Sequence, residues 1–287
     1  MRAALVLLAL CSSLACATPA PRYPGFKLLW SDSFPGAAGA TPNQKKWNII
    51  TDVQTNDEVQ DYSRSNRNLQ ISGGGTVQLV PFKSAKGTWT SARIESRRAF
   101  TPARDRLTTF EAAIRFGDTP AARKQGIWPA FWLLGDAVHH GTPWPRCGEL
   151  DIMETVNGLP AAYGTAHCGA GELGGPCHEP LGRGAAVPLP DYGWHTWALQ
   201  IDRTNATAAG RWEDETIRWL VDGAVFHQIR GADIGDQAVW ATLAHSPMFI
   251  ILNVAVGGNW PGEPNSLTAD GYGSMMEVEY VAVYTSS

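Results

Sequence analysis

The chain has 287 residues, with 23 basic and 27 acidic side chains and a formal net charge of −4. It therefore lacks the basic excess of proteins that bind nucleic acid or anionic membranes, and neither is expected as a partner. Its twelve tryptophans are unusual. Some must lie in the core, but so many also suggest aromatic surfaces for flat apolar ligand faces, such as those of sugar rings.

The first seventeen residues have the pattern of a secretory signal peptide. A charged start is followed by an apolar run from Ala3 to Leu10 and a small-residue cleavage motif at 15–17. We expect residues 1–17 to be removed, with cleavage as late as residue 20 as the alternative. The apolar run is shorter than the roughly 20 residues of a spanning helix, so the sequence predicts a secreted, extracellular protein. Residues 18–287 are expected to form a single domain.

Short strand-like segments fill most of the remaining chain. They alternate apolar and polar residues and are separated by Gly, Pro, Asn and Asp turns. Asp222-Gly223 indicates a two-residue hairpin turn, and 233–241 indicates a short helix or a loop. Many strands without regular helices between them predict an all-β antiparallel sandwich. The expected strands are 68–74, 76–82, 92–100, 108–116, 130–135, 149–154, 163–168, 195–202, 216–223, 224–229, 248–256 and 276–284.

The segment GELDIMETVNG, at 148–158, carries three acids: Glu149, Asp151 and Glu154. In a regular strand, Glu149 and Asp151 share a face, whereas Glu154 points to the other face. In a helix, Glu149 and Glu154 lie about 140° apart. One extra residue in the strand restores the parity. If the three acids act together, we therefore expect a β-bulge near Ile152-Met153.

Carboxylates on one face suit retaining glycoside hydrolysis, in which one attacks the anomeric carbon and another protonates the leaving oxygen. A third carboxylate between them would keep the two pKa values apart. From these residues alone, two other interpretations stay open. The acids are solvated on a strand edge, or they bind Ca²⁺ through their oxygens.

The E-x-D-x-x-E pattern resembles the active-site signature of glycoside hydrolase family sixteen. It has the form with the extra residue, which is typical of laminarinase-like endo-β-1,3(4)-glucanases. The resemblance covers about residues 26–284, and its closest likeness is to secreted fungal β-glucanases. It continues in the same order through TSARIES, GIWPAFWLLG, GTAHC, WHTWALQID, LVDGAVFHQI, ILNVAVGGNWPG and MEVEYVAVY.

The resemblance implies a concanavalin-like β-jelly-roll sandwich with a concave cleft for a β-glucan polysaccharide. It implies a retaining, endo-acting hydrolase of β-1,3-glucan, and it leaves mixed β-1,3-1,4-glucan open as a further substrate. Glu149 is then the nucleophile, Asp151 the assisting carboxylate and Glu154 the general acid/base. The alternatives are a glucan transglycosylase of cell-wall remodelling, a non-catalytic β-glucan recognition protein and a Ca²⁺-dependent adhesive sandwich.

Six further side chains are candidates for substrate contacts. The resemblance places His167 beside the nucleophile. Trp128 and Trp132 share a strand face, with core packing as the alternative. Trp144 and Trp260 lie next to prolines in loops, where tryptophan is seldom core. The strand arginine of SARI matches one that bonds sugar hydroxyls, with an ordinary surface position as the alternative. The full set is Arg93, Trp128, Trp132, Trp144, His167 and Trp260.

Cysteine spacing indicates one disulfide and no metal site. Cys168 and Cys177 bracket a Gly/Pro-rich loop and are expected to pair in an oxidising compartment. Cys147 is then left as a buried thiol. Three cysteines at these spacings match no zinc pattern, and no organic cofactor is implied, although a structural Ca²⁺ stays open. Asn205 begins a glycosylation sequon. We expect a monomer.

Overall fold

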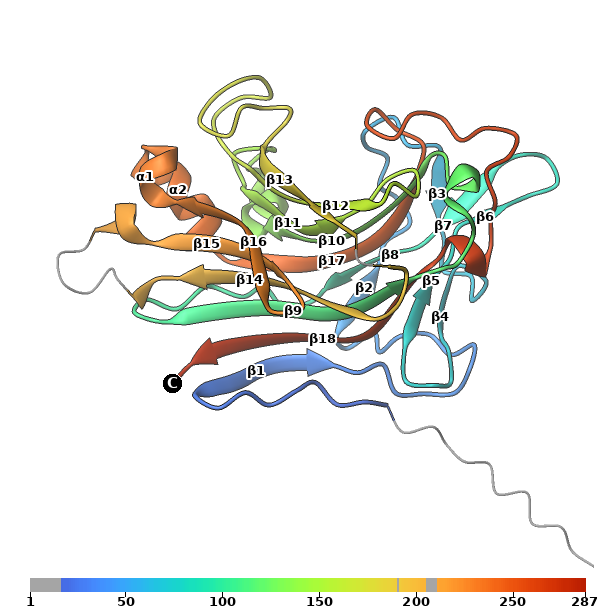
Figure 1. The fold of residues 1–287 in the computed structure, drawn as a ribbon, viewed down its shortest axis with the longest axis horizontal. Coiled ribbons are helices and arrows are strands. Elements are labelled where there is room, and N and C mark those ends of the chain that lie inside the picture. Colours follow the sequence, from blue (N-terminus) through green and yellow to red (C-terminus); the bar gives the residue numbers. More distant parts are fainter. Residues whose placement is uncertain (1–16, 190, 205–210) are drawn as a thin grey trace, which may run out of the picture.

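Two large antiparallel sheets pack face to face and enclose the main hydrophobic core (Figure 1). The computed structural model describes residues 17–189, 191–204 and 211–287. Residues 1–16 of the predicted signal peptide and the sequon residue Asn205 lie outside the described residues. Within them, no helix is long and apolar enough to cross a membrane.

The first sheet has the strand order β16-β15-β14-β9-β18-β5-β4, and β1 pairs with β18. Its strands are β1 (Phe26–Asp32), β4 (Leu69–Ile71), β5 (Val77–Leu79), β9 (Leu107–Phe116), β14 (His195–Asp202), β15 (Thr216–Val221), β16 (Ala224–Arg230) and β18 (Met276–Ser286).

The second sheet has the order β13-β12-β11-β10-β17-β8-β2. Its strands are β2 (Trp47–Ile49), β8 (Arg93–Ser96), β10 (Ile127–Gly135), β11 (Glu149–Glu154), β12 (Ala161–His167), β13 (Arg183–Pro188) and β17 (Met248–Val256). A small third sheet contains β3 (Gln60–Tyr62), β6 (Phe82–Lys83) and β7 (Trp89–Ser91). Two helices, α1 (Gly231–Ile234) and α2 (Gln237–Ala244), follow β16.

The period of two in the sequence explains which side chains enter the core. Along β17, every second residue from Met248 to Val256 belongs to the core cluster, while Asn253 lies on the opposite face. The predicted all-β antiparallel sandwich is therefore confirmed, and each expected strand segment contains a strand. The Asp222-Gly223 turn is confirmed as well, because both residues have the positive φ angles that a type I′ hairpin needs.

The structure adds strands that sequence patterning did not indicate: β1, β2, β3, β7 and β13. All five lie at the edges of the sheets or in the small third sheet. β2, β3 and β7 have three residues each, too few to show a period. The segment 233–241, expected to be a short helix or a loop, contains the end of α1 and the start of α2.

A β-bulge interrupts β11, as the parity of its acids predicted. On β10, Trp132 pairs with Asp151 and Phe131 with Met153, so Ile152 has no partner there. Ile152 and Met153 are consecutive residues, yet both are fully buried in the core. The extra residue thus returns Glu154 to the face that carries Glu149 and Asp151.

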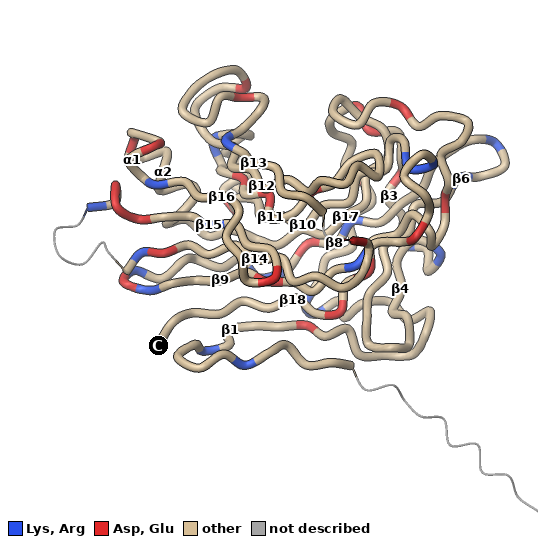
Figure 2. Tube along the Cα trace, viewed as in Figure 1, with Lys and Arg blue, Asp and Glu red and all other residues tan. Residues whose placement is uncertain are grey.

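The strands around this bulge carry no Asp, Glu, Lys or Arg. This holds for β10 and β17 on one side and for β12 on the other. The three acids of β11 therefore lie in an otherwise uncharged part of the second sheet, as Figure 2 shows. Loop segments extend beyond the sheet on either side, among them residues 168–182 before β13 (Figure 1). Because the neighbouring strands supply no Lys or Arg to balance a negative charge, each acid costs more free energy to ionise.

Candidate active site

Cross-strand pairing arranges the three acids in a row along β11. Glu149 lies opposite His167 and Asp151 opposite Thr165, while Glu154 lies opposite Tyr163 on the same neighbouring strand. Oxygen and nitrogen atoms of Glu149, Asp151 and His167 lie within 4.8 Å of one another. The structure therefore brings together the predicted acids and the predicted histidine.

Glu154 is poised to exchange a proton near neutral pH. Its side chain is buried, and Trp128 donates a hydrogen bond from Nε1 to Oε1 at 2.8 Å. Burial raises the pKa of Glu154 to about 7, the hydrogen bond from Trp128 opposes the rise, and the charge of Glu149 adds to it. A carboxyl group with this pKa can act as both acid and base in one cycle.

The surroundings of Asp151 disfavour its ionised form. Burial, followed by the charges of Glu154, Glu149 and Glu179, raises the pKa of Asp151 well above its usual range. Its Oδ2 atom is buried and has no hydrogen-bond partner among the described residues, and Nε2 of His167 lies 3.5 Å away. The backbone carbonyl of Asp151 accepts a hydrogen bond from Trp219 of β15 at 2.7 Å. That bond ties the bulge to the opposite sheet.

Glu149 is the most accessible of the three acids. Burial raises its pKa, while the positive charges of His167 and Arg93 and a hydrogen bond from Trp144 oppose the rise. Glu149 is therefore the acid whose ionised form the surroundings favour most directly.

The cluster of Glu149, Asp151 and His167 offers fewer ligands than the six to eight oxygens that Ca²⁺ takes, so it suits proton and group transfer better than calcium binding.

Sequence reasoning missed Glu179, which contacts Nδ1 of His167. Its Oε2 is 2.7 Å from Nδ1 of His167, and its Oε1 accepts a hydrogen bond from the backbone N–H of Cys168 at 2.8 Å. The net effect on His167 is a raised pKa, because Glu179, Glu149 and Glu154 outweigh the lowering effect of burial. The only signal in the sequence was an acid in the long loop that comes one strand after the acidic strand.

Aromatic rings flank the row of acids at both ends. Trp144 lies beside His167, with ring centroids 5.6 Å apart. At the Glu154 end, Trp260 makes edge contacts with Trp128 at 5.4 Å and with Tyr163 at 5.1 Å, and 44% of Trp260 is exposed. Trp128 is itself partly exposed and outside the core cluster, so these positions suit sugar stacking.

Trp132 lies on β10, next to β11, and Arg93 lies on β8, on the far side of β17. Trp132 donates from Nε1 to Oδ1 of Asn253 at 2.7 Å, and the Arg93 guanidinium lies 5.0 Å from the Trp132 ring centroid. Arg93 also forms a buried ion pair with Glu95 at 2.8 Å, which engages part of its donor set. Asn253 was missed, although it is the only polar residue in MFIILNVAV, an observable signal.

The predicted disulfide forms between Cys168 and Cys177, and Cys147 is free and buried, as expected. Burial, followed by the charge of Glu149, raises the pKa of the Cys147 thiol to about 11. Since the thiolate is the reactive form, this cysteine is unsuited to act as a nucleophile.

Comparisons with known proteins agree with this geometry. A family model described as "XgeA-like, catalytic GH16 domain" matches residues 58–180. A β-glucanase from Rhodothermus marinus is 30% identical, over 91% of this chain and 86% of its own length. A glucan endo-1,3-β-glucosidase A1 from Niallia circulans is 28% identical over 92% of this chain, which spans 38% of that protein.

Among solved structures, the endo-1,3-β-glucanase from Streptomyces sioyaensis matches with a TM-score of 0.86 and 34% identity. The match covers 94% of this chain and all of that one. The expected likeness to fungal enzymes has no support from these relatives.

Titration of Glu154 would test the electrostatics of the site. We expect a midpoint near pH 7 in carbon-13 NMR of labelled glutamate side chains, with Glu154→Gln used to assign the signal. Trp128→Phe removes a hydrogen bond to the ionised carboxylate and should move the midpoint upward. A midpoint in the ordinary glutamate range would contradict the assignment.

Proposed function

This chain belongs to glycoside hydrolase family sixteen, and we propose that it is an endo-acting hydrolase of β-1,3-glucan that works by a retaining double displacement. The observation that carries the proposal is the bulge at Ile152, which puts Glu149, Asp151 and Glu154 on one face. The relatives named as endo-1,3-β-glucanases support the choice of substrate.

Glu149 is the proposed nucleophile. Its carboxylate attacks the anomeric carbon and forms a glycosyl–enzyme ester, while the bond from that carbon to the leaving oxygen breaks. Glu154 gives its proton to the leaving oxygen. In the second half, Glu154 takes a proton from water, whose oxygen attacks the same carbon and releases Glu149. A pKa of about 7 suits Glu154 to both roles.

Asp151 is the proposed assisting carboxyl group. Burial and the neighbouring acids raise its pKa well above the usual range, which disfavours a further negative charge between the two glutamates. In its protonated form, its O–H can donate a hydrogen bond within the cluster it forms with Glu149 and His167. This would stabilise the ionised Glu149 before attack and the departing carboxylate afterwards.

The aromatic rings support cleavage inside a chain rather than at its end. Trp144 lies on the Glu149 side of the site, and Trp128, Trp260 and Tyr163 lie on the Glu154 side. We place sugar rings against both groups, so that the glucan crosses the row of acids and the scissile bond has stacked units on each side.

Other features of the protein remain predictions. These are cleavage of mixed-linkage glucan, the concave cleft, secretion after loss of residues 1–17, glycosylation at Asn205 and a monomeric state. The same applies to a structural Ca²⁺ and to the absence of nucleic acid or membrane partners. Retention of both glutamates supports hydrolysis over a purely recognition role, because binding alone does not require an acid poised near pH 7.

Glu149→Gln should lower kcat on laminarin by at least about 10⁴-fold, because the amide cannot form the ester intermediate. Circular dichroism should show an unchanged fold. Glu172→Gln, which removes an exposed acid in the 168–182 loop, serves as the matched control and should keep full activity. Near-normal activity of Glu149→Gln would end the nucleophile assignment.

The first product should carry the β-anomeric configuration at its new reducing end, because two inversions restore the starting geometry. Proton NMR of the earliest products reports the anomer before mutarotation. An α-product would contradict retention, and products longer than the substrate would identify a transglycosylase instead.

Deletion of Ile152 should remove the bulge and still leave Glu154 on the face of Glu149, because the remaining Glu-Leu-Asp-Met-Glu alternates regularly; any loss of activity should stay within about 10²-fold, from a small displacement of Glu154. Ile152→Val keeps the residue count and costs only about 0.5–1.5 kcal/mol of stability, so it should remain active. Laminarin hydrolysis and thermal unfolding of both variants make the test. A folded deletion variant without any activity would show that strand parity alone does not aim Glu154.

A further inference from the structure

Glu179 lies in an exposed loop, but its side chain is buried. The loop between β12 and β13 has exposed leucines, Leu173 at 80% and Leu181 at 83%, yet Glu179 is only 4% exposed. Both carboxylate oxygens of Glu179 are used, one by the His167 ring and one by the backbone N–H of Cys168. Two backbone hydrogen bonds with Gly174, at 2.7 and 2.8 Å, hold Glu179 from the loop side.

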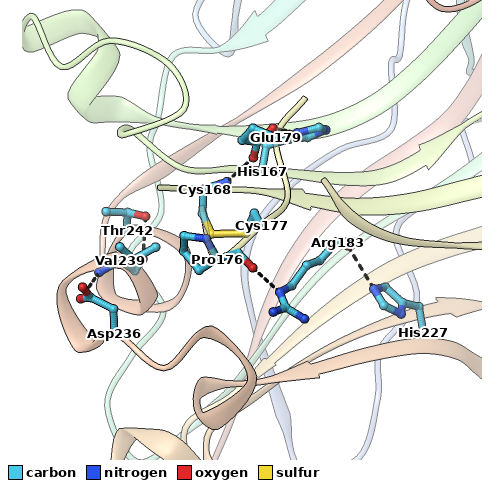
Figure 3. Close-up of a disulfide and its surroundings, with 10 residues drawn as sticks. All are labelled: His167, Cys168, Pro176, Cys177, Glu179, Arg183, His227, Asp236, Val239 and Thr242. Atoms are coloured by element: carbon cyan, nitrogen blue, oxygen red, sulfur yellow. Dashed lines mark hydrogen bonds and ion pairs between the residues drawn. A yellow bond between two sulfur atoms is a disulfide. The ribbon is translucent and has the colours of Figure 1, made fainter. Parts of the chain in front are cut away.

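The disulfide ties this loop to the strand that carries His167. It joins Cys168, which follows His167 directly, to Cys177, which lies two residues before Glu179 (Figure 3). Both cysteines are fully buried. Arg183, at the start of β13, donates a hydrogen bond to the Pro176 carbonyl and fixes the same segment from the other side (Figure 3). Glu179 therefore reaches His167 from a loop with little freedom.

The His167 ring lies between carboxyl groups. Nδ1 is 2.7 Å from Glu179, and Nε2 is 3.5 Å from Oδ2 of Asp151. Glu149, Asp151 and Glu154 on β11 and Glu179 in the loop are the titratable acids that act on the ring. A neutral imidazole has one nitrogen that only accepts, whereas an imidazolium donates from both nitrogens, so negative charge on these acids favours the imidazolium.

Packing fixes the plane of the ring as well. Gly182 has a φ of 72°, and a Cβ there would lie 2.8 Å from Cε1 of His167. The loop backbone therefore packs closely against the Cε1–Nε2 edge of the imidazole, and Trp144 lies beside the ring with its centroid 5.6 Å away. With the ring plane fixed, the hydrogen bond from Nδ1 to Glu179 decides where Nε2–H points.

We propose that Glu179, held by the Cys168–Cys177 loop, is a positioning residue that keeps His167 charged and its Nε2–H directed at Asp151 and Glu149. The role rests on the proposed function, because the charge on His167 would keep the nucleophile Glu149 ionised beside strands that carry no Lys or Arg. The positive charge of His167 lowers the pKa of Glu149, in the direction this purpose requires.

The test compares Glu179→Gln with Glu172→Gln, which removes an exposed acid from the same loop. In Glu179→Gln, NMR of the ring protons should show a lower pKa for His167. The loss in kcat/KM relative to the parent should grow with pH, from about 10-fold near pH 5 to about 100-fold near pH 8. Glu172→Gln should change neither readout. A merely structural role for Glu179 predicts a loss that does not vary with pH.

Glu179→Asp and Glu179→Asn keep the test decisive if the Gln variant does not fold. The two have the same size and differ only in charge, so Glu179→Asp should show the higher His167 pKa and the higher activity at about pH 8. Equal His167 pKa values in this pair, or in the parent and Glu179→Gln, would overturn the proposal. If the parent cleaves no glucan, the proposed function fails, whereas the NMR comparison still decides whether Glu179 charges His167.

Discussion

Three carboxyl groups share one face of a sheet, beside strands that carry no Asp, Glu, Lys or Arg, and the rest of the site offsets the cost of that arrangement. Like charges at short range and low exposure both oppose ionisation, so the group cannot hold three full negative charges. The surroundings distribute protons unequally instead. Trp128 contacts Glu154, His167 and Arg93 act on Glu149, and Asp151 has no hydrogen bond at Oδ2. The pKa differences among these acids follow from these contacts.

Packing in the hydrophobic core fixes the position of β11 and therefore of its three acids. Ile152 and Met153 both anchor in the hydrophobic interior, so β11 cannot slip by one residue without exposing one of them. Trp219 reaches from the opposite sheet to the carbonyl of Asp151 at 2.7 Å, next to the bulged residue. The acids are thus aimed by the backbone and by the apolar side chains beneath them, while their own side chains stay available for chemistry.

Local patterning predicts the features that depend on short stretches of chain. The period of two located the strands, and its failure at Glu154 located the bulge. The even spacing of Trp128 and Trp132 predicted a shared face, and both are partly exposed. Glu179 was not predictable in this way, because its role depends on how a loop without periodicity folds back over β12. The polar contact of Asn253 was recognisable only once its strand neighbours were known.

The bulge also determines which sequence changes can reorganise the site. With the bulge, the two residues between Asp151 and Glu154 both face the core, and Glu154 stays on the face of Glu149. With only one residue between them, simple alternation gives the same result and needs no bulge. At constant length, by contrast, substitutions that straighten β11 would turn Glu154 toward the core. In mutational terms, the three-acid arrangement can survive an in-frame loss of one codon but depends on the bulge for as long as both residues are present.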